Sequence, residues 1–344
     1  MKIKYSCVLL VLSVLFALMA PFPARAEEDA LEWVKIDKPG LHGNVVVRNS
    51  EVNEITVGSR GTIYALDREN NVVYQSFSDG AGWEEITARL VGAGAVLPFS
   101  KIAIAPDATG TVAVVTNNNT EVYLSTDGGV TWNSTNVPGL VAGTIIQTIT
   151  ISKQYTEADE SLREIAIGTA DWGNNTTTGE VWVLQLGKFA SSWQNQSLTV
   201  DPNKIGGEIS AIAYSPSFQR DNTIVVIAST GSDVSAGPPL NYQNQTWLCL
   251  GKRDAAAGTT SWNTGVFNDY PVSIATAGDA VGAYISSSLA LPSNYSGSNA
   301  SSRQLFVSYN RSPSVNDDVY RLDDTTTHRL NANSGVAIDI SSIA

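Results

Sequence analysis

The sequence has little of the chemistry that metal centres and disulfide-stabilised domains require. Its 344 residues include two cysteines and two histidines. Only Cys249 lies beyond the N-terminal segment, so a chain that has lost this segment forms no intrachain disulfide. His42 and His328 are not spaced as a ligand pair, and no acidic run has the spacing of a calcium loop. The sequence therefore predicts no metal site and no cofactor.

Basic residues are also few. The chain has 33 acidic residues against 21 Lys and Arg, a net charge of −12 at pH 7. The first 26 residues hold Lys2, Lys4 and Arg25 and no acid, so without them the balance is 33 acids against 18 bases, a net charge of −15. A charge of this sign disfavours nucleic acid and anionic membrane surfaces as partners.

Long apolar runs are missing everywhere except near the start. Cys7–Ala20 is an apolar stretch, broken only by Ser13, that follows a positive start and precedes a small-x-small site ending at Ala26. This pattern predicts a signal peptide over residues 1–26 and one mature domain over residues 27–344. A transmembrane anchor is the alternative, but the run is short for a bilayer and Pro21 follows it. We expect a secreted, cell-envelope or cell-surface protein without a transmembrane anchor after cleavage.

The most informative stretch of the sequence is Glu121–Gly139, with the sequence EVYLSTDGGVTWNSTNVPG. It begins with the alternation of a half-buried strand. Ser125, Asp127 and Gly129 then supply turn chemistry, because Ser and Asp accept hydrogen bonds from nearby backbone N–H groups and Gly adopts positive φ freely. Trp132 restarts the apolar pattern. The stretch predicts a β-hairpin with a turn fixed by side chains.

The spacing Ser-x-Asp-x-Gly-x-x-Trp resembles the Asp-box of the BNR-repeat β-propellers. That superfamily includes sialidases, some endoglucanases, the sortilin ectodomain and a photosystem assembly factor. The resemblance implies that the box residues are structural, because the box lies at the blade periphery and away from the central site. We therefore expect Ser125, Asp127, Gly129 and Trp132 to fix a turn.

A second, imperfect box precedes the first in the sequence. We expect Ser76, Asp79, Gly80 and Trp83 to have the same structural role. When the two boxes are aligned on their tryptophans, Ser78 stands where the aspartate should be and Asp79 is displaced by one position. The turn chemistry is kept, but the side chain that fixes the turn can differ.

Weak internal repetition predicts the architecture. Trp33–Leu41 and Trp132–Leu140 share the spacing of Trp, Pro, Gly and Leu about a hundred residues apart, which corresponds to two units. The strand pattern predicts an all-β propeller of four-stranded blades with about five blades plus partial ends. Ser334–Ala344 is interpreted as the inner strand of a sixth unit. The chain is then a fragment of a longer propeller, or the strand count is off by one blade. The tryptophans expected to pack between blades are Trp83, Trp132, Trp193 and Trp262.

Catalytic residues are not evident. A sialidase requires an arginine cluster, a Tyr–Glu nucleophile pair and a further acid, and the family carries an Arg-Ile-Pro segment that is absent here. No Glu follows Glu208. For an endoglucanase, Asp171 beside Trp172 is the best candidate for a position near a ligand, because a carboxylate next to an aromatic ring suits a sugar. A solvated loop aspartate is the alternative.

The sequence therefore favours an exported, non-enzymatic β-propeller. Its expected role is that of a cell-surface or envelope binding protein, or a surface-layer protein, whose partner is a cell-surface protein or a glycan. Ser215–Asp221 resembles a linker between strands in bacterial cell-surface propellers. Two alternatives stay open. One is a glycoside hydrolase of the sialidase or endoglucanase type, and the other is a protein like the photosystem assembly factors.

Overall fold

A computed structural model of the chain describes residues 52–171, 179–201, 204–205, 208–229, 246–274, 284–311, 317–330, 340 and 342–343. All of these residues belong to one compact unit, Asp37–Ala344. The predicted signal peptide, Trp33–Ile36 and Trp172 lie outside the described residues. Within the described ranges, no helix is long and apolar enough to cross a membrane.

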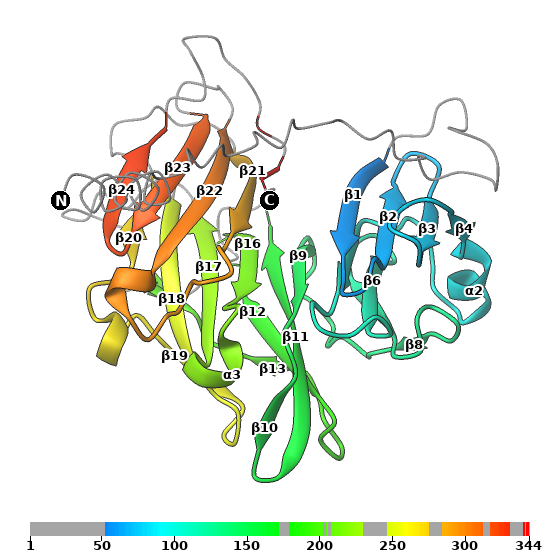
Figure 1. The fold of residues 1–344 in the computed structure, drawn as a ribbon, viewed down its shortest axis with the longest axis horizontal. Coiled ribbons are helices and arrows are strands. Elements are labelled where there is room, and N and C mark those ends of the chain that lie inside the picture. Colours follow the sequence, from blue (N-terminus) through cyan, green and yellow to red (C-terminus); the bar gives the residue numbers. More distant parts are fainter. Residues whose placement is uncertain are drawn as a thin grey trace, which may run out of the picture. The chain divides into compact units, whose positions relative to one another are not determined.

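The described strands form five blades, each built on four antiparallel strands (Figure 1). Blade 1 contains β1 (Val52–Val57), β2 (Ile63–Asp67), β3 (Val72–Ser76) and β4 (Glu84–Glu85). Blade 2 contains β5 (Lys101–Ile104), β6 (Val112–Thr116), β7 (Glu121–Ser125) and β8 (Asn133–Ser134). Blade 3 contains β9 (Ile145–Ile151), β11 (Glu160–Ala170), β12 (Val181–Leu186) and β13 (Gln194–Asn195), with β10 (Tyr155–Glu157) beside β11.

Blade 4 contains β16 (Glu208–Tyr214), β17 (Thr223–Ser229), β18 (Thr246–Asp254) and β19 (Thr259–Trp262), with β20 (Val272–Ser273) beside β18. Blade 5 contains β21 (Tyr284–Ala290), β22 (Gln304–Arg311), β23 (Asp318–Asp323) and β24 (Thr326–Arg329). A small ribbon of β14 (Thr199–Asp201) and β15 (Lys204–Ile205) lies between blades 3 and 4 in the sequence. The helical elements are α2 (Thr87–Gly92), α3 (Phe218–Asp221), η1 (Gly265–Phe267) and η2 (Ala300–Ser302).

The first strands of successive blades are neighbours, in the order β1, β5, β9, β16 and β21. Each blade therefore packs face to face on the next. Between blades 3 and 4, for example, Ala166 and Val183 share one apolar cluster with Ile212 and Val226. The predicted fold class is confirmed: the chain is a nearly all-β protein whose five blades form a β-propeller.

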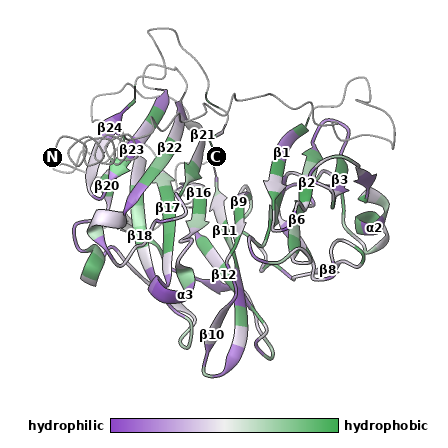
Figure 2. Cartoon of the chain, viewed as in Figure 1, coloured by the Kyte–Doolittle hydropathy of each residue, from purple (hydrophilic) through white to green (hydrophobic). Residues whose placement is uncertain are grey.

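Strands of the middle blades are buried on both faces. All five residues of β6 and all seven residues of β17 are buried. Such strands are nearly continuous apolar runs, and Figure 2 shows the hydrophobic colouring along β17. Valine and isoleucine dominate them because their branched side chains fit a pleated, packed surface.

The positions of the tryptophans in the blades have a physical meaning. Trp132 belongs to the apolar cluster between blades 1 and 2, Trp193 to the cluster between blades 2 and 3, and Trp262 to the cluster between blades 3 and 4. Each of the three therefore packs toward the preceding blade, as predicted. Trp83 instead clusters with Ala65 and other residues of its own blade. No strand that precedes blade 1 is among the described residues, so the packing of Trp83 between blades stays a prediction.

Candidate functional site

The hairpin turn after β7 is fixed by two side chains. The Ser125 hydroxyl donates to Oδ1 of Asp127 (2.7 Å) and accepts the N–H of Gly129 (2.9 Å). Asp127 Oδ1 also accepts the N–H of Thr131 (2.9 Å), and the Trp132 indole donates to the Gly129 carbonyl (3.1 Å). Thr131 donates its hydroxyl to Asp127 Oδ2 as well (2.6 Å). These groups bond to one another, and that geometry fits the structural role expected of them.

The imperfect box after β3 forms a similar turn with different atoms. The Ser76 hydroxyl accepts the N–H of Gly80 (3.1 Å), as Ser125 does in the other turn. Ser78 accepts the N–H of Gly82 (3.1 Å), the position that the aspartate fills in blade 2. Asp79 itself has φ of 53° and donates its N–H to the Gly61 carbonyl (3.0 Å). A serine hydroxyl therefore replaces the carboxylate, because both can accept an N–H four residues on.

Asp171 lies where β11 ends, between blades 3 and 4. The side chain is 4% exposed rather than solvated, so the expectation of a solvated loop residue is wrong. Gly143, which precedes β9, makes room for it: a Cβ on Gly143 would lie 3.3 Å from both carboxylate oxygens of Asp171. Its predicted neighbour Trp172 lies outside the described residues. Thr169 bonds both the N–H and the carbonyl of Glu180, which ties together the two ends of the segment after Asp171.

Glu208, the first residue of β16, is the partner that the sequence did not reveal. Its Oε2 accepts the backbone N–H of Asp171 at 2.5 Å, and the residue is 8% exposed. We call Asp171 and Glu208 the carboxyl pair. The two residues are 37 positions apart, and they meet because β11 of blade 3 packs against β16 of blade 4.

The carboxyl pair has unusual electrostatics. Burial raises the pKa of Glu208 to about 7, and the nearby Asp171 carboxylate acts in the same direction, while the Asp171 N–H opposes them. Near neutral pH, Glu208 is therefore present in both protonation states. A carboxyl group with this property can donate a proton or a hydrogen bond, which is the behaviour of a general acid.

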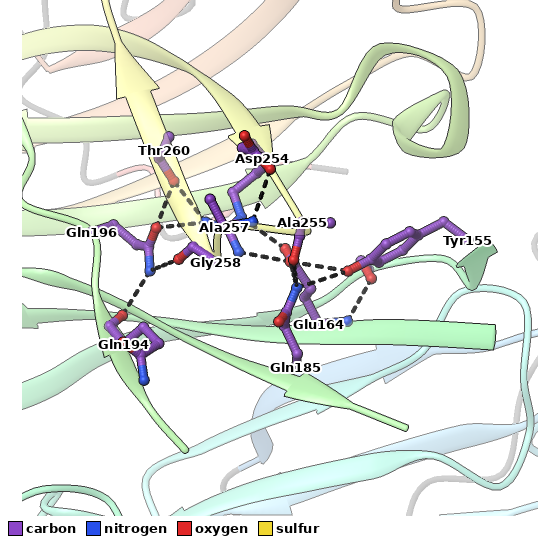
Figure 3. A network of polar contacts seen from close by, with 12 residues as sticks. Tyr155, Glu164, Gln185, Gln194, Gln196, Asp254, Ala255, Ala257, Gly258 and Thr260 are labelled. Atoms are coloured by element: carbon purple, nitrogen blue, oxygen red, sulfur yellow. Dashed lines mark hydrogen bonds and ion pairs between the residues drawn. The ribbon is translucent and has the colours of Figure 1, made fainter. Parts of the chain in front are cut away.

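A second polar cluster lies in the interior of the protein, between blades 3 and 4 (Figure 3). Glu164 of β11 pairs with Arg253 of β18 through two hydrogen bonds of 2.7 and 3.0 Å. The hydroxyls of Tyr155 and Tyr214 each donate to a Glu164 oxygen at 3.1 Å. Arg253 also donates to Gln196, at 2.5 Å. We call these five residues the buried network.

The buried network contains the residue types of a sialidase site. Unlike the residues of such a site, its side chains are not accessible to a substrate. Glu164 is fully buried, Arg253 is 2% exposed and Tyr155 is 4% exposed. Burial raises the pKa of Tyr214 well above its usual value, and the Glu164 charge adds to the effect. A tyrosine nucleophile needs the opposite shift and an open path to substrate. The network is therefore suited to joining two blades.

The linker Ser215–Asp221 also joins two blades, blade 4 and blade 5. Asp221 is fully buried and accepts hydrogen bonds from the Ser215 hydroxyl (2.7 Å), the Thr223 N–H (3.1 Å) and the Gly297 N–H (2.8 Å). Gly297 belongs to the segment before β22 of blade 5, so the linker of blade 4 holds its neighbour. In the part of the chain that the structure describes, no three His, Cys, Asp or Glu side chains gather as a metal site.

Sequence reasoning missed Glu208 and the buried network for one reason. The central contact of each joins different blades, at separations of 37 residues for Asp171 and Glu208 and 89 for Glu164 and Arg253. A local signal was nonetheless available, because a single charged residue within an apolar strand, such as Glu164, requires a buried partner. That signal indicates that a partner exists without saying which one.

No family model matches this sequence, and no curated protein matches it. Solved structures resemble its fold. One is YCF48 bound to D1 peptide, with 9% identity over 86% of this chain and 73% of that chain, and a TM-score of 0.41. Another is an ancestral GH74 enzyme, with 15% identity over 84% of this chain and a TM-score of 0.46. This chain covers 32% of the length of that enzyme.

A third similar structure is the α-L-arabinofuranosidase Arb93A from Fusarium graminearum with an iminosugar inhibitor. The identity is 14% over 90% of this chain and 86% of that chain, with a TM-score of 0.41. These neighbours include two hydrolases and one peptide-bound protein. At such identities and TM-scores they carry no argument about the activity of this chain.

Proposed function

We propose that this chain is an exported β-propeller that binds a cell-surface protein or glycan and has no hydrolase activity. The observation that carries the proposal is the burial of Glu164 and Arg253 together with Tyr155 and Tyr214. These residues have the chemistry of a hydrolase site, yet they are used to join blades 3 and 4. The predicted leader over residues 1–26 and the acidic composition support an extracellular location.

The proposed binding region is the end of blades 3 and 4 at which the carboxyl pair lies. Asp171 and Glu208 stand where three chain segments meet, before β9, after β11 and at the start of β16. Loops at the ends of a rigid scaffold are common positions for recognition. Both residues are buried, at 4% and 8% exposure, so the pair holds together the chain segments that meet there, and a ligand contacts those segments rather than the carboxyl groups.

A glycoside hydrolase is the second candidate, and Glu208 is the observation that favours it. A carboxyl group whose pKa is raised to about 7 close to a second carboxyl group shares one property with the general acid of a glycoside hydrolase, its protonation near neutral pH. In that case Glu208 is the general acid and Asp171 the second carboxylate.

One experiment separates the two candidates. The mature protein, residues 27–344, is incubated with fluorogenic sialosides, β-glucans and arabinofuranosides, and in parallel with immobilised glycans and isolated cell envelopes. The variants are Glu208→Gln, Asp171→Asn and the matched control Glu84→Gln, whose side chain lies on the exposed periphery of blade 1.

We expect no turnover of any glycoside. We also expect saturable binding that Asp171→Asn weakens about tenfold or more and that Glu84→Gln leaves unchanged. Turnover that disappears in Glu208→Gln and persists in Glu84→Gln would replace the binding proposal with the hydrolase. Binding that is equal in all variants would place the recognition surface elsewhere.

A further inference from the structure

The two end blades are covered differently from the middle blades. In β23 of blade 5, burial alternates along the strand, with Asp318, Tyr320 and Leu322 buried and the residues between them partly exposed. In β1 of blade 1, Ile55 and Val57 are 60% and 63% exposed. Because successive side chains of a strand point to opposite faces, one face of each end blade is packed and the other is less covered.

The less covered face of blade 5 is polar along its first strands. In β21, Ser287 bonds Ser210 of blade 4, so its neighbours Ser286 and Ser288 point away from blade 4. Asn310 of β22 is paired with Ser286 in register, and its amide donates to the Ser286 hydroxyl at 3.2 Å. Ser286, Ser288 and Asn310 therefore share one face, which we call the outer face of blade 5.

The residues near the end of the sequence lie on this outer face. The Asn310 side chain donates to the Ile340 carbonyl (2.5 Å) and accepts the Ile340 N–H (2.6 Å). The Ser288 hydroxyl contacts both the N–H of Ile343 (3.4 Å) and its carbonyl (3.3 Å). An amide side chain offers one donor and one acceptor side by side, as a peptide group does, so Asn310 can hold an extended backbone in place.

The same relationship occurs between two blades that are fully described. On β1, the side chain of Glu54 accepts the Ile102 N–H of β5 at 3.1 Å. Thr56 of β1 accepts the Ile104 N–H of β5 at 3.3 Å. In both places, polar side chains on the first strands of one blade bond the backbone of the strand that begins the next.

We propose that the outer face of blade 5 is a docking surface for extended backbone and that Ile340 and Ile343 of the chain itself occupy it, at the position of a sixth blade. Asn310 and Ser288 recognise the backbone of these residues, so recognition depends little on their side chains. The surface is thereby closed to a second copy or to an unrelated extended segment. The inference is independent of the carboxyl pair and of the proposed function.

Hydrogen–deuterium exchange of the mature protein tests this inference. The variant is Asn310→Ala, which removes both bonds to Ile340. The matched control is Asn299→Ala, which removes two side-chain bonds to Ser301 before β22 of the same blade. We expect the peptide that contains Ile340 to exchange about tenfold faster in Asn310→Ala, the order expected when two hydrogen bonds are lost, and to be unchanged in Asn299→Ala. Peptides from β17 report whether the fold is intact.

Two results would overturn the inference. One is fast exchange of the Ile340 peptide in the wild-type protein, and the other is protection that persists in Asn310→Ala. The experiment is run at two protein concentrations, because protection that rises with concentration would assign the docked segment to a second copy. Unchanged protection of β17 in the variant keeps a folding defect from being mistaken for lost docking.

Discussion

The guanidinium of Arg253 meets the carboxylate of Glu164 in the interior of the protein, between strands of two different blades. Two hydrogen bonds of 2.7 and 3.0 Å join them, and neither side chain is more than 1% exposed. Two tyrosine hydroxyls and an amide complete the coordination of the carboxylate. Most of the interface between blades 3 and 4 is apolar, so this pair fixes how the two blades are placed against each other.

Removing one partner of this pair should destabilise the protein strongly. Glu164→Ala leaves the Arg253 cation buried without its carboxylate, and we expect the free energy of unfolding to fall by about 3–5 kcal/mol. Equilibrium denaturation with guanidinium chloride measures the change. The control Glu84→Gln alters an ion pair in which Glu84 is 55% exposed, and we expect it to change stability by less than about 0.5 kcal/mol.

A double substitution separates the charge effect from loss of packing. In the variant that combines Glu164→Leu with Arg253→Met, no unpaired charge is left buried. We expect it to be more stable than either single variant, because replacing a buried pair by apolar groups costs less than breaking it. The single and double variants form a double-mutant cycle. If their losses in the free energy of unfolding are additive, Glu164 and Arg253 act separately and the pair is not coupled.

The turn after β7 should depend on Ser125. The residue is 1% exposed and its hydroxyl accepts the N–H groups of Asp127 and Gly129, so Ser125→Ala leaves the buried Gly129 N–H without this partner. We expect a loss of about 1–2 kcal/mol in the free energy of unfolding.

Asp127→Ala should lower the melting temperature without affecting binding to glycans or cell envelopes. Lost binding at an unchanged melting temperature would assign the turn a functional role.

Local chemistry explains what could be predicted from the sequence. The strands follow from apolar alternation, and the turn at Ser125 follows from side chains that bond the adjacent backbone. The helix α2 was not predicted, because its six residues bury only Leu90 and show no helical period. Glu208 was not identified as the partner of Asp171, because their meeting depends on which blades are neighbours. Contacts between blades depend on how the whole propeller is assembled, so the sequence of a single segment gives little indication of them.

Gly168 should tolerate no side chain, because β11 approaches β16 closely there. A Cβ on Gly168 would lie 2.3 Å from a methyl carbon of Ile209 and 2.8 Å from one of Thr148. We expect Gly168→Ala to destabilise the protein by about 1–3 kcal/mol through overpacking. Thermal unfolding measures the effect. Gly92→Ala is the matched control, because a Cβ there meets nothing within 4 Å, and an unchanged or higher melting temperature is expected.

The carboxyl pair should make stability depend on pH in a definite direction. Burial raises the pKa of Glu208 from 4.5 to about 7 in the folded protein, so between these values the folded state holds a proton that the unfolded state has released. The free energy of unfolding therefore falls as the pH rises through this range. Allowing for solvent screening, we expect a loss of roughly 2 kcal/mol between about pH 5 and pH 8.

Glu208→Gln should remove this dependence, because glutamine carries no titrating proton and can still accept the Asp171 N–H. Denaturation at a series of pH values compares the wild-type protein, Glu208→Gln and the control Glu84→Gln. We expect the first variant to have a flatter profile and to gain stability relative to the wild-type protein above about pH 7, while the control follows the wild-type profile. If the profiles of all three proteins are parallel, Glu208 ionises near its ordinary pKa. The proton-donating role of the carboxyl pair, and with it the hydrolase alternative, would then lose its physical basis.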